Sequence, residues 1–375
     1  MLAKVLFYGG LAAIGWTHAG YPLAAGALAR VRPRPVAKGD ILPTVSLIVA
    51  AHDEATVIER RVRNLLALDY PPERVEVVVA SDASTDETDA IVERIARTER
   101  RVRLLPCPRG GKVHAQNLAV RRTTGEIVAF SDANATWAPD ALRELVKPFA
   151  DPDVAYVCGQ LRLEQADGTN REGAYWRCEV RLRQSESELG SVTGGNGAIY
   201  ALRRSDYVEV DPRFGHDLAL PHLMVQHGRR AVSEPAAHAF EKPSRDLEDE
   251  YRRKVRMFEH CWLILLEGRM LRDVPPLYLA QLVSHRVLRY GSGIAHLALG
   301  IGSVALAGRG GIYRTVLAAQ LAGLGLAAAG RLRAPVPGAS LAYYYVLVTQ
   351  ATLVALARYL RLGVPAVWEK AEGTR

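Results

Sequence analysis

The sequence predicts an α/β domain with a mostly parallel sheet, attached to membrane-spanning helices at both ends. Two observations lead to this prediction. From residue 45 onward, short apolar runs rich in β-branched residues alternate with segments of helical periodicity. In addition, residues 1–30 and 291–362 are long, apolar and poor in charge. The formal net charge of +8 allows an anionic lipid or a phosphate-bearing substrate as partner.

Composition disfavours two other classes of protein. The sequence contains no aromatic-rich basic motif of the RNA-binding kind, so nucleic acid is not an expected partner. Its four cysteines have no C-x-x-C spacing, so we expect neither a zinc site nor a disulfide framework.

The N-terminal residues 1–30 carry Lys4 as their main charge before Arg30, and basic residues continue through a Pro-broken linker at residues 31–43. A signal peptide is the alternative interpretation. The length of the apolar stretch and the basic residues after it favour a transmembrane helix whose cytoplasmic end is the linker. The sequence therefore predicts that the domain after this linker lies on the cytoplasmic side of the cell membrane.

The C-terminal residues 291–362 contain three apolar stretches, followed by a tail at residues 363–375. These stretches, at residues 294–307, 316–329 and 340–357, are rich in Gly and Ala, which favours close helix packing in lipid. A helical hairpin in a soluble core is the alternative. We predict a multi-pass membrane protein.

Residues 44–245 form the predicted α/β domain. Its expected strands lie at residues 44–51, 75–80, 102–105, 127–130, 154–160 and near 230–233. Its expected helices lie at residues 54–68, 85–96, 113–121, 138–149, 171–189 and 218–226. Residues 246–290 follow as amphipathic helices that combine basic and aromatic side chains, a pattern typical of the membrane interface.

Polar side chains follow the central apolar run 127–130. Asp132 and Asn134 stand one residue apart directly after it, and Trp137 follows them. A carboxylate at the carboxyl end of a parallel strand lies where open α/β sheets bind ligands. Because carboxylate and amide oxygens suit Mg²⁺ or Mn²⁺, we predict a metal site at Asp132 and Asn134. An Asx turn at the strand end is the alternative.

Acidic residues also follow the first two predicted strands. Asp53 and Glu54 come after the first strand, and Asp82 ends the second. Asp82 could accept a hydrogen bond from a uracil N–H or a ribose hydroxyl. Each of these acidic groups could equally cap the helix that follows it.

Basic groups and a further carboxylate complete the set. Lys112 follows the pair Gly110–Gly111, and a lysine beside turn amides suits a phosphate. Asp217 comes later in the chain, ahead of Arg253 and Arg256.

In this order, the motifs resemble those of the membrane-bound family 2 glycosyltransferases, the enzymes related to hyaluronan, cellulose and poly-N-acetylglucosamine synthases. The resemblance covers roughly residues 45–258, and each motif is weak when taken alone. It implies a GT-A fold, the Rossmann-like mixed sheet of nucleotide-diphospho-sugar transferases, with flanking transmembrane helices. It also implies a divalent metal and a nucleotide-sugar donor.

The resemblance assigns a role to each matching residue. Asp82 matches the aspartate that contacts the nucleoside, Asp53 and Glu54 match the Asn-Glu pair after the first strand, and Lys112 matches the basic residue after the third. Asp132 matches the first aspartate of the D-x-D metal motif, and Asp217 matches the general base. Arg253 and Arg256 fall on the Q-x-x-R-W motif, which holds the diphosphate.

Three departures from the family pattern stand out. Asn134 replaces the second metal aspartate, which removes a charge. His216 stands where an acidic residue usually precedes the base, so it could be the base itself or tune Asp217. Arg253 and Met257 replace the Gln and Trp of the Q-x-x-R-W motif, which puts processive synthesis in doubt.

The predicted activity is inverting transfer of a sugar from a nucleotide sugar, with UDP expected, to a hydroxyl of a polysaccharide or lipid-linked acceptor. The expected acceptor contacts are Trp137, Trp176, Gly194, Gly195 and Asn196. Two alternatives stay open. One is a polyprenyl-phosphate glycosyltransferase of the dolichyl-phosphate mannose synthase type. The other is a nucleotide-sugar- or lipid-binding membrane protein with weakened catalysis.

Overall fold

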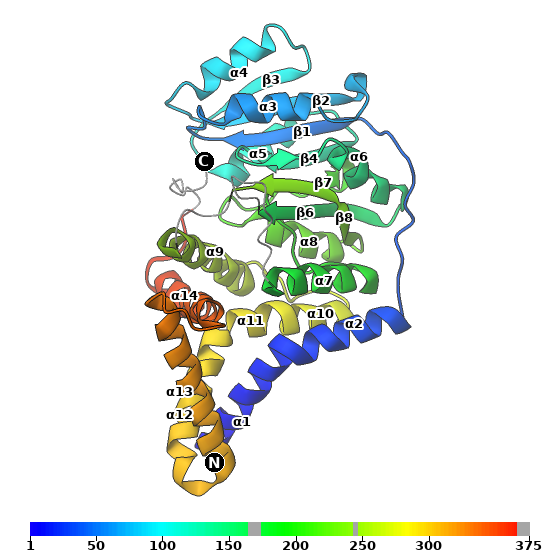
Figure 1. Ribbon diagram of the computed structural model, residues 1–375. Coiled ribbons are helices and arrows are strands. Elements are labelled where there is room, and N and C mark those ends of the chain that lie inside the picture. The colour runs from blue at the N-terminus through cyan, green and yellow to red at the C-terminus, as the bar shows by residue number, and fades with distance from the viewer. Residues whose placement is uncertain (164–173, 243–246, 366–375) are drawn as a thin grey trace. The chain divides into compact units, whose positions relative to one another are not determined.

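The computed structural model describes residues 1–163, 174–242 and 247–365 (Figure 1). The chain divides into two compact units. The first, here called the sheet unit, centres on residues 25–245 and 266–279. The second, the helical unit, comprises residues 1–24, 246–265 and 280–364.

An eight-stranded sheet forms the centre of the sheet unit, in the order β3-β2-β1-β4-β7-β6-β8-β5 (Figure 1). The strands are β1 Val45–Ala51, β2 Val75–Asp82, β3 Val102–Cys107, β4 Ile127–Asp132, β5 Thr136–Trp137, β6 Val154–Leu163, β7 Tyr200–Arg203 and β8 Arg230–Glu241. β1 pairs in parallel with β2 and β4, and β2 pairs in parallel with β3, as the strand–helix alternation predicted. β7 runs antiparallel to both β4 and β6, so the sheet is mixed.

Besides the two-residue β5, which was not expected, two strands differ from the sequence-based expectation. The Gly-rich segment after residue 192, where no strand was expected, contains β7, which lies between β4 and β6. β8 extends to Glu241, well beyond the strand expected near residues 230–233, and pairs with β6 and β5. Both strands are stabilised by partners distant in sequence, which local periodicity cannot reveal.

Helices cover the sheet on both faces. They are α3 Ile58–Leu66, α4 Thr88–Ala96, α5 Lys112–Arg121, α6 Ala141–Val146, α7 Ala174–Leu189 and α8 His216–Gln226. Leu47 and Val49 point from β1 into the main apolar core, which α3, α4 and α6 complete. Side chains alternate between the faces of a strand, so Phe130 of β4 stacks on Tyr200 of β7 in a separate aromatic layer, with ring centroids 4.8 Å apart.

The helical unit contains the apolar ends of the chain. Its helices are α1 Leu2–Gly15, α9 Leu247–Glu267, α11 Leu288–Tyr290, α12 Ser292–Leu306, α13 Gly311–Arg331 and α14 Ala339–Leu362; α2 Tyr21–Val31 and α10 Pro276–Leu282 run across the boundary of the units in the sequence. α1 packs closely on α12, because a Cβ atom on Gly302 would lie 2.6 Å from the backbone nitrogen of Phe7. Small residues permit such a close approach of two helices, as in membrane helix pairs.

Within the described residues, α13 and α14 are long and apolar enough to cross a membrane. A third candidate is the pair Pro276–Tyr290 and Ser292–Arg309, which is bent by 66°. The helix predicted at residues 1–30 is not in this set. A π-helical segment, Trp16–Gly20, divides it into α1 and α2, of 14 and 11 residues.

Candidate active site

The predicted strand-end residues gather at one edge of the sheet. Asp82 ends β2 and Asp132 ends β4, and these strands lie on either side of β1. In open α/β sheets this edge, at the carboxyl ends of the parallel strands, is where ligands bind. The sequence spacing therefore places these residues together, although about 50 residues separate them in the chain.

Asp82 is buried, with 2% of its surface exposed. Its Oδ1 accepts hydrogen bonds from the backbone N–H groups of Gly110 at 2.7 Å and Gly111 at 3.1 Å. Its Oδ2 accepts one from the guanidinium of Arg109 at 2.5 Å. The carboxylate of Asp82 thus holds the loop that leads into α5, where Lys112 is the first residue.

Asp53 links the end of β1 to the loop after β2. Its φ of 52° lies in the left-handed region, which Asp tolerates better than most residues. Its Oδ1 accepts a hydrogen bond from the backbone N–H of Thr85 at 2.7 Å. This bond, with a smaller contribution from His52, lowers the pKa of Asp53. Glu54 is buried, and its backbone N–H donates to Thr88 Oγ1 at 2.7 Å.

Lys112 forms an ion pair with Asp132. Burial alone would lower the pKa of Lys112, but the charges of Asp132, Asp217 and Glu241 together raise it above its usual value. We call these three carboxylates the acidic cluster. They come from β4, the first turn of α8 and the end of β8. Three carboxylates thus act on the charge of this one lysine.

The loop of residues 194–197 lies beside this ion pair. A Cβ atom on Gly197 would be 3.3 Å from both Lys112 Nζ and Asp132 Oδ2. The N–H of Gly195 donates to the backbone carbonyl of Asp217 at 2.6 Å. Asn196 is buried and donates to the carbonyl of Gly159 at 2.7 Å. Gly194 is buried as well. The predicted acceptor loop is thus near Asp132, but the Asn196 amide serves the protein's own backbone.

His216 is 4% exposed. Its Nδ1 lies 2.9 Å from the hydroxyl of Tyr200, and its ring meets that of Phe130 edge-on. Burial, and next the charge of Lys112, lower the pKa of His216 to about 3. At neutral pH the ring is therefore uncharged and a weak base, packed against the aromatic rings of Phe130 and Tyr200.

The two tryptophans expected to contact an acceptor differ. Trp137 is 1% exposed, and its indole N–H donates to the carbonyl of Ala198 at 2.9 Å. Its ring therefore presents no surface to an acceptor in this structure, and the expectation of a direct contact does not fit its burial. Trp176 belongs to α7, but its side chain lies outside the described residues.

Arg253 and Arg256 lie on α9, in the helical unit. Arg253 pairs with Glu250 at 2.8 Å. Burial, and next the charge of Arg253, lower the pKa of Arg256, so the two guanidinium groups are neighbours as helical spacing predicted. Their assignment to the diphosphate stays a prediction.

Sequence reasoning missed two residues of this edge. Arg109 bonds to Asp82, and its place directly before the Gly pair could have suggested a role. Glu241 belongs to the acidic cluster, but no motif surrounds it, and only the pairing of β8 with β6 brings it there.

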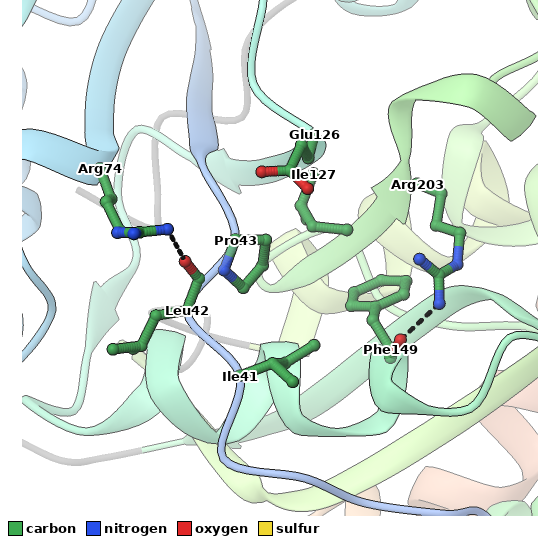
Figure 2. Close-up of a pocket in the computed structure, with 8 residues that line it drawn as sticks. All are labelled: Ile41, Leu42, Pro43, Arg74, Glu126, Ile127, Phe149 and Arg203. Carbon is green, nitrogen blue, oxygen red and sulfur yellow. Dashed lines mark hydrogen bonds between the residues drawn. The ribbon is translucent and has the colours of Figure 1, made fainter.

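A cavity of about 380 Å³ lies at the opposite edge of the sheet (Figure 2). It is lined by Ile127 at the start of β4 and Arg203 at the end of β7. Its two arginines are used within the protein, since Arg74 donates to the carbonyl of Leu42 at 2.6 Å and Arg203 donates to that of Phe149 (Figure 2). This hollow is therefore separate from the acidic edge.

The acidic edge suits a hard divalent cation by its chemistry. Among the described residues, no group of three or more His, Cys, Asp or Glu side chains is arranged to hold a metal by itself. Asp132 and Asn134 nevertheless carry oxygen atoms that can serve as metal ligands, close to the other carboxylates of the acidic cluster. Phosphate oxygens can complete the coordination shell of such an ion. The ammonium of Lys112 already compensates Asp132 there.

A mixed sheet with an acidic edge of this kind defines a GT-A fold, the fold of nucleotide-diphospho-sugar transferases. Residues 46–210 match the family model "Glycosyl transferase family 2", so this domain belongs to that family. The prediction of a GT-A fold is confirmed, and the family match bears out the resemblance to family 2 glycosyltransferases.

Named relatives are glycolipid and polysaccharide synthases. A β-monoglucosyldiacylglycerol synthase from Synechocystis sp. is 33% identical over 178 residues, 44% of this chain and 36% of the relative. A poly-β-1,6-N-acetyl-D-glucosamine synthase from Staphylococcus aureus is 23% identical over 241 residues, 62% of this chain and 58% of the relative. Each match thus covers less than two thirds of the relative's length.

A solved structure resembles nearly the whole chain. It is the mannosyltransferase PcManGT from Pyrobaculum calidifontis in complex with GDP-Man and Mn²⁺. The TM-score is 0.72 and the identity 25%, and the match covers 96% of this chain and 99% of the other. The likeness extends beyond the family 2 domain to the flanking helices.

Proposed function

We propose that the protein is a membrane-bound inverting glycosyltransferase that moves a sugar from a nucleoside-diphosphate sugar to a hydroxyl of a lipid or lipid-linked glycan. The observation that carries the proposal is the acidic cluster around Lys112 at the carboxyl ends of the strands. It combines a cation-attracting site with a phosphate-binding lysine and a candidate base.

The proposed base is Asp217, in the first turn of α8. It takes the proton of the acceptor hydroxyl as that oxygen attacks the anomeric carbon of the donor sugar. The bond from this carbon to the diphosphate breaks, and the nucleoside diphosphate leaves with the electron pair. Attack opposite the leaving group inverts the configuration. His216, uncharged and bonded to Tyr200, supports the start of α8 instead of acting as base.

Lys112 offsets the negative charge that develops on the departing diphosphate. Asp132 and Asn134 would hold a Mg²⁺ or Mn²⁺ ion, which, when bound, would neutralise the same charge. The solved mannosyltransferase was obtained with Mn²⁺, which supports this assignment. We assign Arg253 and Arg256 to the same diphosphate because of their position in the family motif.

The nucleoside is assigned to the ends of β1 and β2, with Asp53, Glu54 and Asp82. Asp82 acts through the loop that it holds, since its carboxylate already accepts bonds from Arg109 and Gly110. The sequence favoured UDP, and the similar structure contains GDP-Man, so both nucleotides belong in the test.

The acceptor assignment rests on the relatives that make glycosylated diacylglycerol and on the helical unit. A lipid or lipid-linked acceptor reaches a membrane-bound enzyme by diffusion in the bilayer. The candidate spans α13 and α14 support this location, and we propose a multi-pass protein of the cell membrane with its sheet unit in the cytoplasm.

The test uses the full-length protein in lipid nanodiscs with Mn²⁺ and a panel of UDP- and GDP-sugars. Release of nucleoside diphosphate is measured without acceptor, with diacylglycerol and with a polyprenyl phosphate. We expect release from one donor that rises with one lipid, and a product of inverted configuration by NMR. The Asp217→Asn variant is the control. Binding of a donor without any release would instead indicate a binding protein.

A further inference from the structure

Arg61, on α3, is a buried arginine with an incomplete set of hydrogen bonds. It is 1% exposed, and its Nε and Nη2 have no hydrogen-bond partner in the described part of the structure. Its Nη1 donates to Asn64 Oδ1 at 2.5 Å. Its guanidinium carbon lies 5.1 Å from the centre of the Trp137 ring. Burying a charged group with unsatisfied donors is costly, so its presence needs an explanation.

Asn64, one turn further along α3, binds the backbone of Trp137 twice. Its Nδ2 donates to the Trp137 carbonyl at 3.0 Å, and its Oδ1 accepts from the Trp137 N–H at 2.9 Å. These two bonds fix the end of the segment 132–137, which begins at Asp132 and contains Asn134. Because Arg61 also donates to Asn64 Oδ1, it orients the amide for both contacts.

Arg61 also acts on the acidic cluster through its charge. Burial lowers its pKa to about 9, while Asp132 of β4 and Glu241 of β8 oppose this shift. The guanidinium is therefore charged at neutral pH, and two of the three carboxylates of the acidic cluster stabilise its charged form. Lys112 approaches the same cluster from a different helix, α5.

We propose that Arg61 and Asn64, which we call the α3 support, position the segment 132–137 so that Asp132 and Asn134 present their oxygens to the cation and the donor diphosphate. Both are positioning residues, since neither touches the reacting atoms. The inference rests on the proposed function and adds residues outside the family motifs. It explains why an arginine with unsatisfied donors is kept where an apolar residue would pack without that cost.

The test compares Arg61→Met and Asn64→Ala with Arg63→Met. Arg63 lies on the same helix, but it is exposed and pairs with Glu59 at 2.7 Å, so it is a matched control. Four quantities are measured for each full-length variant: kcat and KM for nucleoside diphosphate release, the melting temperature, and the Kd for Mn²⁺ by EPR in the presence of UDP or GDP.

We expect Arg61→Met and Asn64→Ala each to lower kcat about tenfold or more and to weaken Mn²⁺ binding. The reason is that the segment 132–137, which carries Asp132 and Asn134, is no longer held in place. Arg61→Met should keep or raise the melting temperature, since it replaces a buried charge with an apolar chain. The double variant should lose no more than the more damaging single change, because both residues act on one segment. Arg63→Met should match the wild type.

Arg61→Lys separates charge from shape. A buried lysine loses its proton at lower pH than an arginine does, so the activity that this variant recovers near pH 7 should fall at a lower pH than that of the wild type. The charged groups that face this position are Asp132 and Glu241.

Wild-type kcat and Mn²⁺ affinity in Arg61→Met would overturn the inference. So would a loss of activity that the fraction of unfolded protein fully accounts for. If the wild type binds Mn²⁺ with nucleotide but releases nothing from any donor, the proposed function fails while the Mn²⁺ comparison still decides the α3 support. Failure of the wild type to bind Mn²⁺ would overturn both.

Discussion

Asp82 and Asp132 end two strands on either side of β1, yet their carboxylates are compensated differently. Asp82 is satisfied by two backbone N–H groups and Arg109, all from one loop. Asp132 is compensated by the side chain of Lys112, in an ion pair that remains partly exposed. Backbone donors hold a carboxylate in place, whereas a partly exposed ion pair contributes little and can exchange its cation. Asp82 is therefore held by its own loop, whereas Asp132 can exchange the ammonium of Lys112 for another cation.

The strongest test of the acidic cluster around Asp132 is Asp217→Asn, which keeps the shape of the side chain but removes its basicity. We expect kcat to fall by about 10²–10⁴, with unchanged nucleotide affinity by calorimetry. His216→Ala should lose much less, because His216 is buried and uncharged at neutral pH. The opposite ranking of these two variants would move the base to His216.

Asp132→Ala tests whether the carboxylate of Asp132 can exchange Lys112 for a metal ion. We expect transfer to fall by about 10²–10³ and Mn²⁺-dependent nucleotide binding to disappear. The melting temperature should change little, since a partly exposed ion pair contributes only about 0–1 kcal/mol. Asn134→Asp should keep or raise Mn²⁺ affinity. Normal transfer by Asp132→Ala would remove this residue from the metal site.

Asp82→Ala should show the opposite pattern. Removing its carboxylate leaves Arg109 and the amides of Gly110 and Gly111 without their acceptor, which should cost about 2 kcal/mol of stability. Thermal melting beside UDP and GDP titrations measures both effects, and Asp140→Ala, at an exposed position, is the control. Normal stability with lost nucleotide binding would show that Asp82 contacts the nucleoside directly.

Arg256→Lys extends the comparison to the predicted diphosphate contact on α9. Lysine keeps the charge but cannot bind two phosphate oxygens at once, so transfer should fall about tenfold. Arg252→Lys, at an exposed position of the same helix, should have no effect. If Arg256→Lys transfers normally while Arg256→Ala no longer binds vesicles of anionic lipid, α9 serves as a lipid-binding helix.

The smallest expected effect is a pH dependence of stability from His216. Its pKa in the folded protein is about 3, against about 6.5 when unfolded, so only the unfolded chain takes up the proton between these values. Stability should therefore fall as the pH drops below 6.5, by about 1 kcal/mol at pH 5.5. Melting curves of His216→Asn should show less acid sensitivity, and His227→Gln, an exposed histidine, should not. An unchanged slope in His216→Asn would contradict the assignment.

Much of the sheet could be predicted from the sequence, because its parallel strands are buried on both faces and appear as continuous apolar runs, as in Val75–Asp82. Residues at the ends of such strands must meet at one edge, so Asp82 and Asp132 were predictable as neighbours. β7 was not, because a four-residue strand shows no periodicity and its partners lie far away in sequence. The role of Trp137 was not predictable either, since an aromatic ring after a strand can be exposed or buried.

The sequence by itself determined the class of fold, the apolar ends and the order of the polar groups, because all three depend on local patterns of burial and charge. The tertiary structure decided which polar groups form their hydrogen bonds within the protein and which form ion pairs that can exchange their cation. Glu241 joins Asp132 only because β8 extends along β6, and Arg61 reaches the segment 132–137 only because α3 packs against Trp137. Electrostatic and hydrogen-bonding partners are set by distance in space, which short-range sequence patterns do not encode.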